Sequence, residues 1–300
     1  MLALACAAGC SSATTGATTG SSASGPAAAG STTGASAPAP SATASASGTP
    51  STASPTPAAP PTPTPSATPT VEPATVVREA AAATGRTSAR VDQSVRLTNG
   101  DTTYDLAVSG DFDLAADRGQ LGVDLPGGAI SHLDEIFADG QVYVRGSAGV
   151  PSGTWAAIDR DRTIAHALLR SPVNDPEHVL QQISTLGRVT RSGEEEVSGV
   201  RATRYDGMLT TDAVTLRLAP EIRSKLETYR SLSGSDLPIP AGVWVDPQGR
   251  VVKVQLTLDM SPIHSVTTVA FSELGKAVKV TAPPARNTTA VTELSGVLTG

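Results

Sequence analysis

The side chains that most often carry catalysis or bind metals are few in this sequence and stand far apart. The four histidines, His132, His166, His178 and His264, show no His-x-x-x-His spacing and have no cysteine nearby, so each is interpreted as a surface or partly buried residue. No Gly-x-Ser-x-Gly elbow and no phosphate-binding glycine loop occurs. The sequence therefore predicts a non-enzymatic protein with no catalytic residue, no metal and no cofactor.

One acidic run could in principle bind a cation. Glu194, Glu195 and Glu196 follow Gly193 directly, and carboxylate oxygens are the ligands that calcium prefers. No Asp-x-Asp-x-Asp loop accompanies the run. Because charged runs at strand starts are usually solvated, we interpret these residues as the end of a hairpin.

The two cysteines point to a different chemistry, which is acylation. Cys6 and Cys10 lie at the extreme N-terminus, and Ala7-Ala8-Gly9 precedes Cys10. This junction resembles the lipobox at the end of a bacterial lipoprotein signal peptide, although Ala7 stands where leucine is usual and the basic region and most of the apolar region are missing. We expect the true signal peptide to begin upstream and Cys10 to carry the lipid anchor, including palmitate or a similar acyl chain. Cys6, or an ordinary cleaved signal, are the alternatives.

A long uncharged tract follows the cysteine. Residues 11–71 contain no Asp, Glu, Lys, Arg or His and consist almost wholly of Ser, Thr, Ala, Gly and Pro. Such a chain cannot bury enough apolar surface to offset the entropy of ordering. We predict a signal remnant at 1–10, a disordered tether at 11–71 and one folded domain at 72–300.

The charge balance restricts the partners of that domain. The chain has 22 basic and 28 acidic residues and a formal net charge of −6. A nucleic-acid partner would require a clustered basic face, and no such cluster occurs. No nucleic-acid partner is therefore expected.

The apolar pattern of the domain alternates between strands and helices. Residues 72–85 have a helical pattern that ends at Gly85, and 89–97 alternate with period two before the hairpin signal Asn99-Gly100. The remaining predicted strands are 102–108, 120–125, 141–145, 154–158, 188–197, 200–209, 242–245, 251–258, 265–271 and 277–280. The remaining predicted helices are 163–169, 175–186 and 220–232. Many antiparallel strands with a few helices predict an α+β domain.

Several strand and turn segments together resemble a known family. They are Gly140–Gly146, Trp155–Asp159, Gly193–Gly199 with Thr203–Tyr205, Gly242–Gly249, Phe271–Gly275 and Val280–Pro283. Between residues 73 and 284 the sequence resembles the actinobacterial LppX/LprG lipoproteins and, more distantly, the LolA-like carriers. The resemblance implies a curved antiparallel half-barrel sheet with helices packed in its concavity, and an apolar cavity that binds an acylated lipid or glycolipid. It supplies no catalytic residues.

The lipid-binding residues are predicted from strand alternation. Tyr143 and Trp244 fall on the opposite faces of their strands from the aliphatic residues, and we choose the aliphatic set because acyl chains need apolar area. The predicted lining is Val142, Val144, Trp155, Val243, Val245, Val252, Val254, Leu256 and Leu258. For the tryptophans, core packing is the competing interpretation.

Two functions remain open at this point. The first is an envelope lipoprotein that carries or presents a lipid at the extracytoplasmic face of the cell membrane, with an envelope transporter as a candidate partner. The second is a non-catalytic sensory or protein-interaction ectodomain of the same fold. An apolar cavity of several hundred Å³ would favour the first and a filled core the second.

The anchor prediction can be tested with the full signal peptide restored. Cys10→Ser should move the protein from the membrane to the soluble fraction, because the acyl chains would have no thiol to attach to. Fractionation and immunoblotting measure this, with Cys6→Ser as the matched control that should stay on the membrane. Membrane retention of the Cys10→Ser, Cys6→Ser double variant would refute a cysteine anchor.

Overall fold

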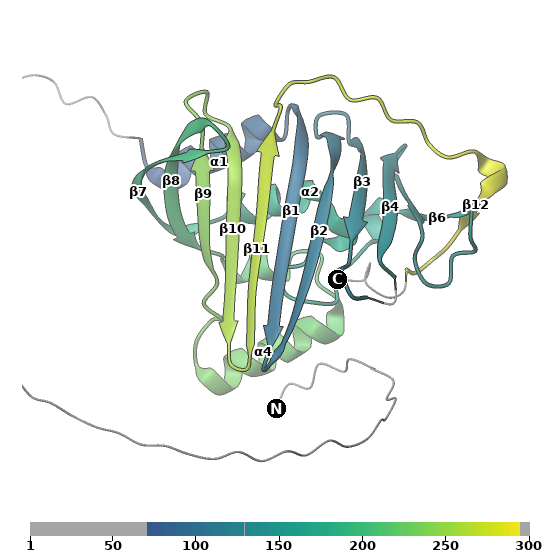
Figure 1. Ribbon diagram of the computed structural model, residues 1–300. Helices are drawn as coiled ribbons and strands as arrows, with labels where there is room; N and C mark the ends of the chain where they lie inside the picture. Colours follow the sequence, from purple (N-terminus) through teal and green to yellow (C-terminus); the bar gives the residue numbers. More distant parts are fainter. Residues whose placement is uncertain (1–70, 129, 295–300) are drawn as a thin grey trace, which may run out of the picture. The chain divides into compact units, whose positions relative to one another are not determined.

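A single open β-sheet dominates the computed structural model, which describes residues 71–128 and 130–294 (Figure 1). It has 12 strands in the order β12-β6-β5-β4-β3-β2-β1-β11-β10-β9-β8-β7. Neighbouring strands pair antiparallel except β12 and β6, which are parallel. Cys10 and the tether up to residue 70 lie outside the described residues.

The sheet is built as two runs of hairpins that meet in its middle. The first run comprises β1 (Ser88–Asn99), β2 (Thr102–Asp113), β3 (Arg118–Asp124), β4 (His132–Ala138), β5 (Gln141–Arg145) and β6 (Trp155–Asp159). The second comprises β7 (Gly187–Val197), β8 (Val200–Met208), β9 (Pro240–Val245), β10 (Val251–Met260) and β11 (Ile263–Ser272). β11 pairs with β1, with Val95 opposite Thr267, and this pairing joins both runs into one sheet.

The helices begin where the sequence supplies caps. The Glu72 carboxylate accepts a hydrogen bond from the Ala74 amide at 3.2 Å, and α1 (Pro73–Thr84) starts with proline at its first position. Asp175 caps α2 (Pro176–Ser184) in the same way, again with proline next. The short α3 (Thr211–Thr215) and the longer α4 (Pro220–Ser233) follow, and α4 ends at Gly234 in the left-handed conformation.

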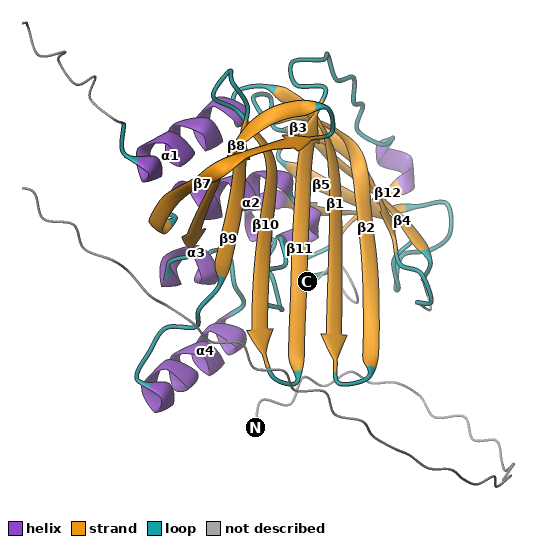
Figure 2. Ribbon diagram, turned by 60° about the vertical axis from the view of Figure 1, so that its left-hand side comes forward, coloured by secondary structure: helices purple, strands orange, loops and turns teal. Residues whose placement is uncertain are grey.

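The helices α1, α2 and α3 lie inside the curve of the sheet, and α4 lies at one end of it (Figure 2). α1 packs against β7, β9 and β10, and against α2. Its Val77, Ala80 and Ala81 share one apolar cluster with inward strand residues such as Val91 and Val254. We call the sheet face that bears these inward residues the concave face.

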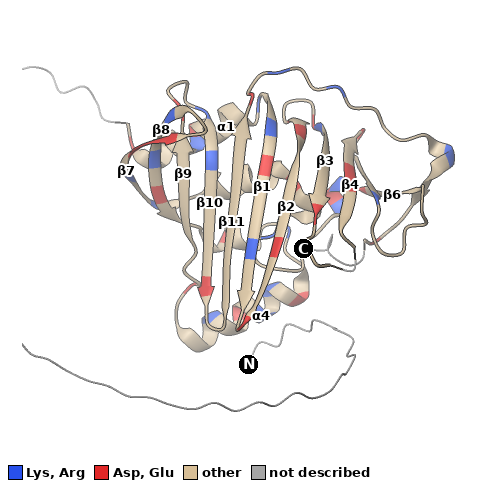
Figure 3. Ribbon diagram, in the orientation of Figure 1, with Lys and Arg blue, Asp and Glu red and all other residues tan. Residues whose placement is uncertain are grey.

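Charged residues occur at intervals along several strands, β1 and β2 among them (Figure 3). Along β1 they alternate with the buried residues. Arg90, Asp92 and Arg96 of β1 point outward, as the period-two pattern predicts, whereas Val91 and Val95 are buried. The Arg96 guanidinium bonds Asp105 of β2 at 2.8 Å on this outer face. Exposed pairs of this kind stabilise the fold little, so the apolar alternation decides which face is inside.

The structure corrects two predicted elements. Residues 163–169 do not form a helix, because Ala165 pairs with the chain near Leu218 and Leu169 has a φ of 62°. Residues 277–280 form no strand in the described chain; Val280 instead packs against the outer cluster that contains Trp155. Sequence reasoning also missed β4, α3 and β12 (Thr288–Ala290).

One strand position requires glycine because two strands approach closely there. A Cβ on Gly110 of β2 would overlap the backbone carbonyl oxygen of Gln120 in β3. A Cβ on Gly122 would meet mainly the movable His132 ring, at 3.3 Å.

We therefore expect Gly110→Ala to lower the free energy of unfolding by roughly 1–3 kcal/mol, as overpacking does. Gly122→Ala should leave it unchanged or raise it slightly, since alanine loses less backbone entropy in a strand. Chemical denaturation of both variants measures the difference. Equal effects at the two positions would contradict the close approach of β2 and β3.

Candidate functional site

The concave face carries most of the predicted lining residues. Val142 and Val144 of β5, Val243 and Val245 of β9, and Val254, Leu256 and Leu258 of β10 all belong to its apolar cluster, and each is at most 5% exposed. Helix residues such as Val77 of α1 and Ile183 of α2 belong to the same cluster. The structure thus brings seven of the nine predicted residues to one interior that the protein's own helices cover.

The other two predicted residues, Trp155 and Val252, lie on the outer face, which corrects their predicted position. Trp155 packs with Ile136 and Ala138, and the Arg145 guanidinium lies 4.6 Å from the centre of its ring. Val252 packs with Ala202 and Trp244 because the register of β10 shifts between Val251 and Lys253. A bulge of this kind reverses the alternation, so Val251 takes the inward place that Val252 was expected to take.

A buried carboxyl interrupts the apolar lining. Glu135 of β4 is 0% exposed and stands opposite Leu121 and Val144. The Asn174 side-chain amide donates to its Oε1 at 2.9 Å, while Oε2 has no hydrogen-bond partner among the described residues. Burial raises the pKa of Glu135 to about 8, so the carboxyl is mainly protonated at neutral pH. Sequence reasoning missed this residue because β4 itself was not predicted.

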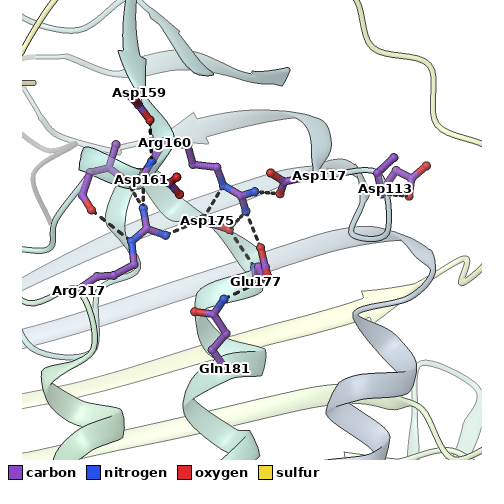
Figure 4. Close-up of polar contacts among 11 residues, drawn as sticks. Asp113, Asp117, Asp159, Arg160, Asp161, Asp175, Glu177, Gln181 and Arg217 are labelled. Carbon is purple, nitrogen blue, oxygen red and sulfur yellow. Dashed lines mark hydrogen bonds and ion pairs between the residues drawn. The ribbon is translucent and has the colours of Figure 1, made fainter. Parts of the chain in front are cut away.

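A polar hub is formed by Arg160, Asp175, Glu177 and Arg217 (Figure 4). Arg160, which follows β6, donates two hydrogen bonds to the Asp175 carboxylate at 2.9 and 2.7 Å, and both residues are almost fully buried. Arg217, from the turn before α4, bonds the same carboxylate at 3.0 Å. Asp117 and Glu177 also pair with Arg160. The hub ties β6, α2 and the α3–α4 connection together, so its role is to position the helices.

His178 of α2 is a further buried polar group. It is 2% exposed, which corrects the expectation of a surface or partly buried histidine. Burial lowers the pKa of His178 to about 4, and the imidazole is therefore neutral at pH 7. Within residues 71–128 and 130–294 no group of three or more His, Cys, Asp or Glu side chains could hold a metal ion.

An open cleft of about 1040 Å³ lies where α4 meets the ends of β7 and β8. Gly187, Arg188 and Met208 line one side, and Glu227 and Arg230 of α4 line the other. None of the nine predicted residues lines it. α4 itself contributes one buried side chain, Leu226, to the apolar cluster, and its partly buried Tyr229 packs against it.

The comparison with known families agrees with this architecture. A family model described as LppX_LprAFG lipoprotein matches residues 72–280. The chain belongs to this family. The match spans nearly the same residues as the resemblance noted in the sequence, and no curated protein matches the chain.

Two solved structures of mycobacterial lipoproteins are similar to this chain. LprF from Mycobacterium bovis shares 13% identity with a TM-score of 0.43, covering 72% of this chain and 98% of LprF. LppX from Mycobacterium tuberculosis shares 15% identity with a TM-score of 0.42, covering 69% of this chain and 97% of LppX.

In the part of the chain that the structure describes, no helix is long and apolar enough to cross a membrane.

Because Glu135 is buried, we predict that the unfolding free energy depends on pH. The raised pKa of Glu135 gives a contribution to stability that is complete below pH 4.5 and is lost as pH rises towards about 8. The lowered pKa of His178 has the opposite effect: it reduces stability as pH falls below 6.5. Between pH 6.5 and 8 we therefore expect the unfolding free energy to fall by about 2 kcal/mol.

Glu135→Gln should remove this fall, because the amide does not titrate, whereas His178→Gln should keep it. Urea denaturation across that pH range measures both variants against the native sequence. Parallel profiles for the native protein and Glu135→Gln would show that Glu135 does not titrate as a buried carboxyl.

Proposed function

We propose that the domain binds an acylated lipid or glycolipid against its concave face and carries or presents it outside the cell membrane. The observation that supports this most is the extent of the apolar face, which runs from β5 to β9 across the middle of the sheet. Among the strand residues described there, Glu135 is the one buried carboxyl. The protein would be held at the membrane through Cys10 and would make or break no covalent bond in its ligand.

The energetics of such a face suit long acyl chains. Burial of one methylene contributes about 0.8 kcal/mol, so two chains can be held without a single directed contact. The aliphatic side chains Val142, Val144, Val254, Leu256 and Leu258 offer area and no charge. A charged headgroup would therefore stay outside this face.

A lipid could reach this face only if the covering elements move. The seven lining residues are buried beneath the protein's own helices and loops, whereas α4 has one buried side chain, Leu226, and leaves Leu232 84% exposed. α4 also borders the open cleft. We infer that acyl chains enter beside α4, because this helix is held in place by less apolar contact than the other helices.

A non-catalytic sensory or protein-interaction ectodomain is the second candidate. The observation that favours it is the filled interior, because the predicted lining residues contact protein atoms from the helices. In that case the concave face would be an ordinary core.

Filling the concave face separates the two candidates. Val144→Trp and Val254→Trp should each abolish uptake of a fluorescent acyl lipid, because the indole would occupy the volume of the chains. Gln255→Trp, one residue along β10 on the outer face, is the control and should bind normally. Each variant must retain a cooperative thermal melt.

Native mass spectrometry of protein purified from its own membrane provides the second readout. An acyl lipid that co-purifies with the native sequence would support the carrier function. If the native protein neither takes up the fluorescent lipid nor co-purifies with one, the interaction ectodomain becomes the better explanation.

A further inference from the structure

Two neutral polar side chains stand at the centre of the concave face without partners. Gln93 of β1 is 4% exposed and Thr267 of β11 is 3% exposed. The Gln93 Nε2 and the Thr267 Oγ1 are buried, and neither forms a hydrogen bond within the described residues. An unpaired buried polar group weakens the folded state, and most such groups in proteins are satisfied.

The register of the sheet places these two groups beside each other. Val95 of β1 is directly opposite Thr267, and Gln93 is two residues from Val95 on the same face. The two side chains are therefore diagonal neighbours on adjacent strands. β1 and β11 are the seventh and eighth strands of the 12-stranded order, which puts the pair in the middle of the sheet.

Their surroundings on the sheet are aliphatic. Val108 and Val269 stand opposite Gln93, and Val95 and Leu256 stand opposite Thr267. Each of these residues is buried in the apolar cluster. Aliphatic side chains at positions 93 and 267 would continue that lining, so the fold itself gives no reason for an amide and a hydroxyl there.

We propose that Gln93 and Thr267 form an internal polar anchor that donates hydrogen bonds to the ester carbonyl oxygens of a bound acyl lipid. The amide and hydroxyl are uncharged donors, and they match a neutral acceptor within an apolar chain better than a phosphate or carboxylate, whose burial here would be unfavourable. The inference rests on the proposed lipid-binding function and adds the substrate class: lipids whose chains are joined through esters. Ser265, two residues before Thr267 on the same face and 5% exposed, continues the polar positions along β11.

A pair of lipids that differ only in the linkage tests this. Dipalmitoylglycerol has two ester carbonyls, and its dihexadecyl ether has the same chain lengths and none. The native protein should bind the ester about tenfold more tightly, as one or two neutral hydrogen bonds would give. Displacement of a fluorescent acyl lipid measures both affinities.

The near-isosteric double variant Gln93→Leu, Thr267→Val should bind the two lipids equally, with its affinity for the ether unchanged. Thr268→Val, on the outer side of β11, is the matched control and should keep the preference for the ester. The ligand-free double variant should melt at the same or a higher temperature, because it no longer buries unpaired polar groups. A clearly lower melting temperature would mean that the fold itself uses these groups.

The outcomes separate the anchor from the proposed function. Equal affinity of the native protein for ester and ether, or a preference that persists in the double variant, would overturn the anchor while lipid binding stands. This comparison in the native protein decides the question even if the double variant does not fold, and the single variants then show which donor contributes. If the native protein binds neither these lipids nor the fluorescent one, the lipid-binding function fails with the anchor.

Discussion

Each strand of the sheet sends alternate side chains to a single interior, and that interior must be shielded from water by a few short helices. Inward residues of the 12-stranded sheet belong to one apolar cluster with residues of α1, α2 and α3. Curvature brings the inward residues of distant strands towards the same helices, so that Val142 of β5 and Val243 of β9 join one cluster. The pairing of β1 with β11 is what allows this, because it joins two independent runs of hairpins into a continuous surface.

The helices need a fixed position relative to the sheet, and the polar hub provides it. A buried Arg160 or Asp175 would strongly disfavour folding if it stood alone, because its charge would be uncompensated. Losing one partner of such a pair is therefore far more destabilising than losing both. Here the carboxylate accepts from Arg160, from Arg217 and from the Glu177 amide, so its oxygens are well satisfied. The Arg160 guanidinium also lies about 5.5 Å from the Phe137 ring. The charges of the hub are thereby paired with one another, while the inward strand residues are mainly apolar, with polar exceptions such as Glu135, Gln93 and Thr267.

Local sequence signals predicted the elements, and pairing between distant segments explains where they failed. Asn99-Gly100 and the period-two alternation of β1 and β2 predicted their hairpin because turn chemistry and side-chain period are properties of the segment itself. The inward position of Val252 was not predictable, since a one-residue bulge in β10 is defined only by its partner β9. In the same way, 163–169 has an apolar pattern that suits a helix, yet its backbone pairs with residues about fifty positions later.

Polar residues of the site were the hardest to foresee, for a related reason. Glu135 lies on the same strand face as Leu133 and Phe137, so period-two alternation places it inward. A carboxyl in that place contradicts the usual preference for solvent. Gln93 shares its face with Val91 and Val95, and nothing local shows that its amide lacks a partner. Whether a buried polar group is satisfied depends on the whole interior, which a sequence does not display.

The helices that cover the concave face are held with unequal strength. An interior that is shielded from water can therefore be reached by a ligand where the most weakly held helix moves. α1 presents small side chains such as Ala80 and Ala81, which bury little area each, but the Thr84 hydroxyl also accepts a hydrogen bond from the Val251 amide of β10 at 2.8 Å. α2 is fixed at its N-terminus by the hub. α4 is joined to the hub only through Arg217 in the connection before it, and in the described residues its own side chains form no hydrogen bond with a strand. Leu226 is its one buried side chain. Displacing α4 would therefore expose less apolar area than displacing another helix. A ligand that replaces the protein's own side chains on the concave face would meet the smallest free-energy cost at this end of the sheet.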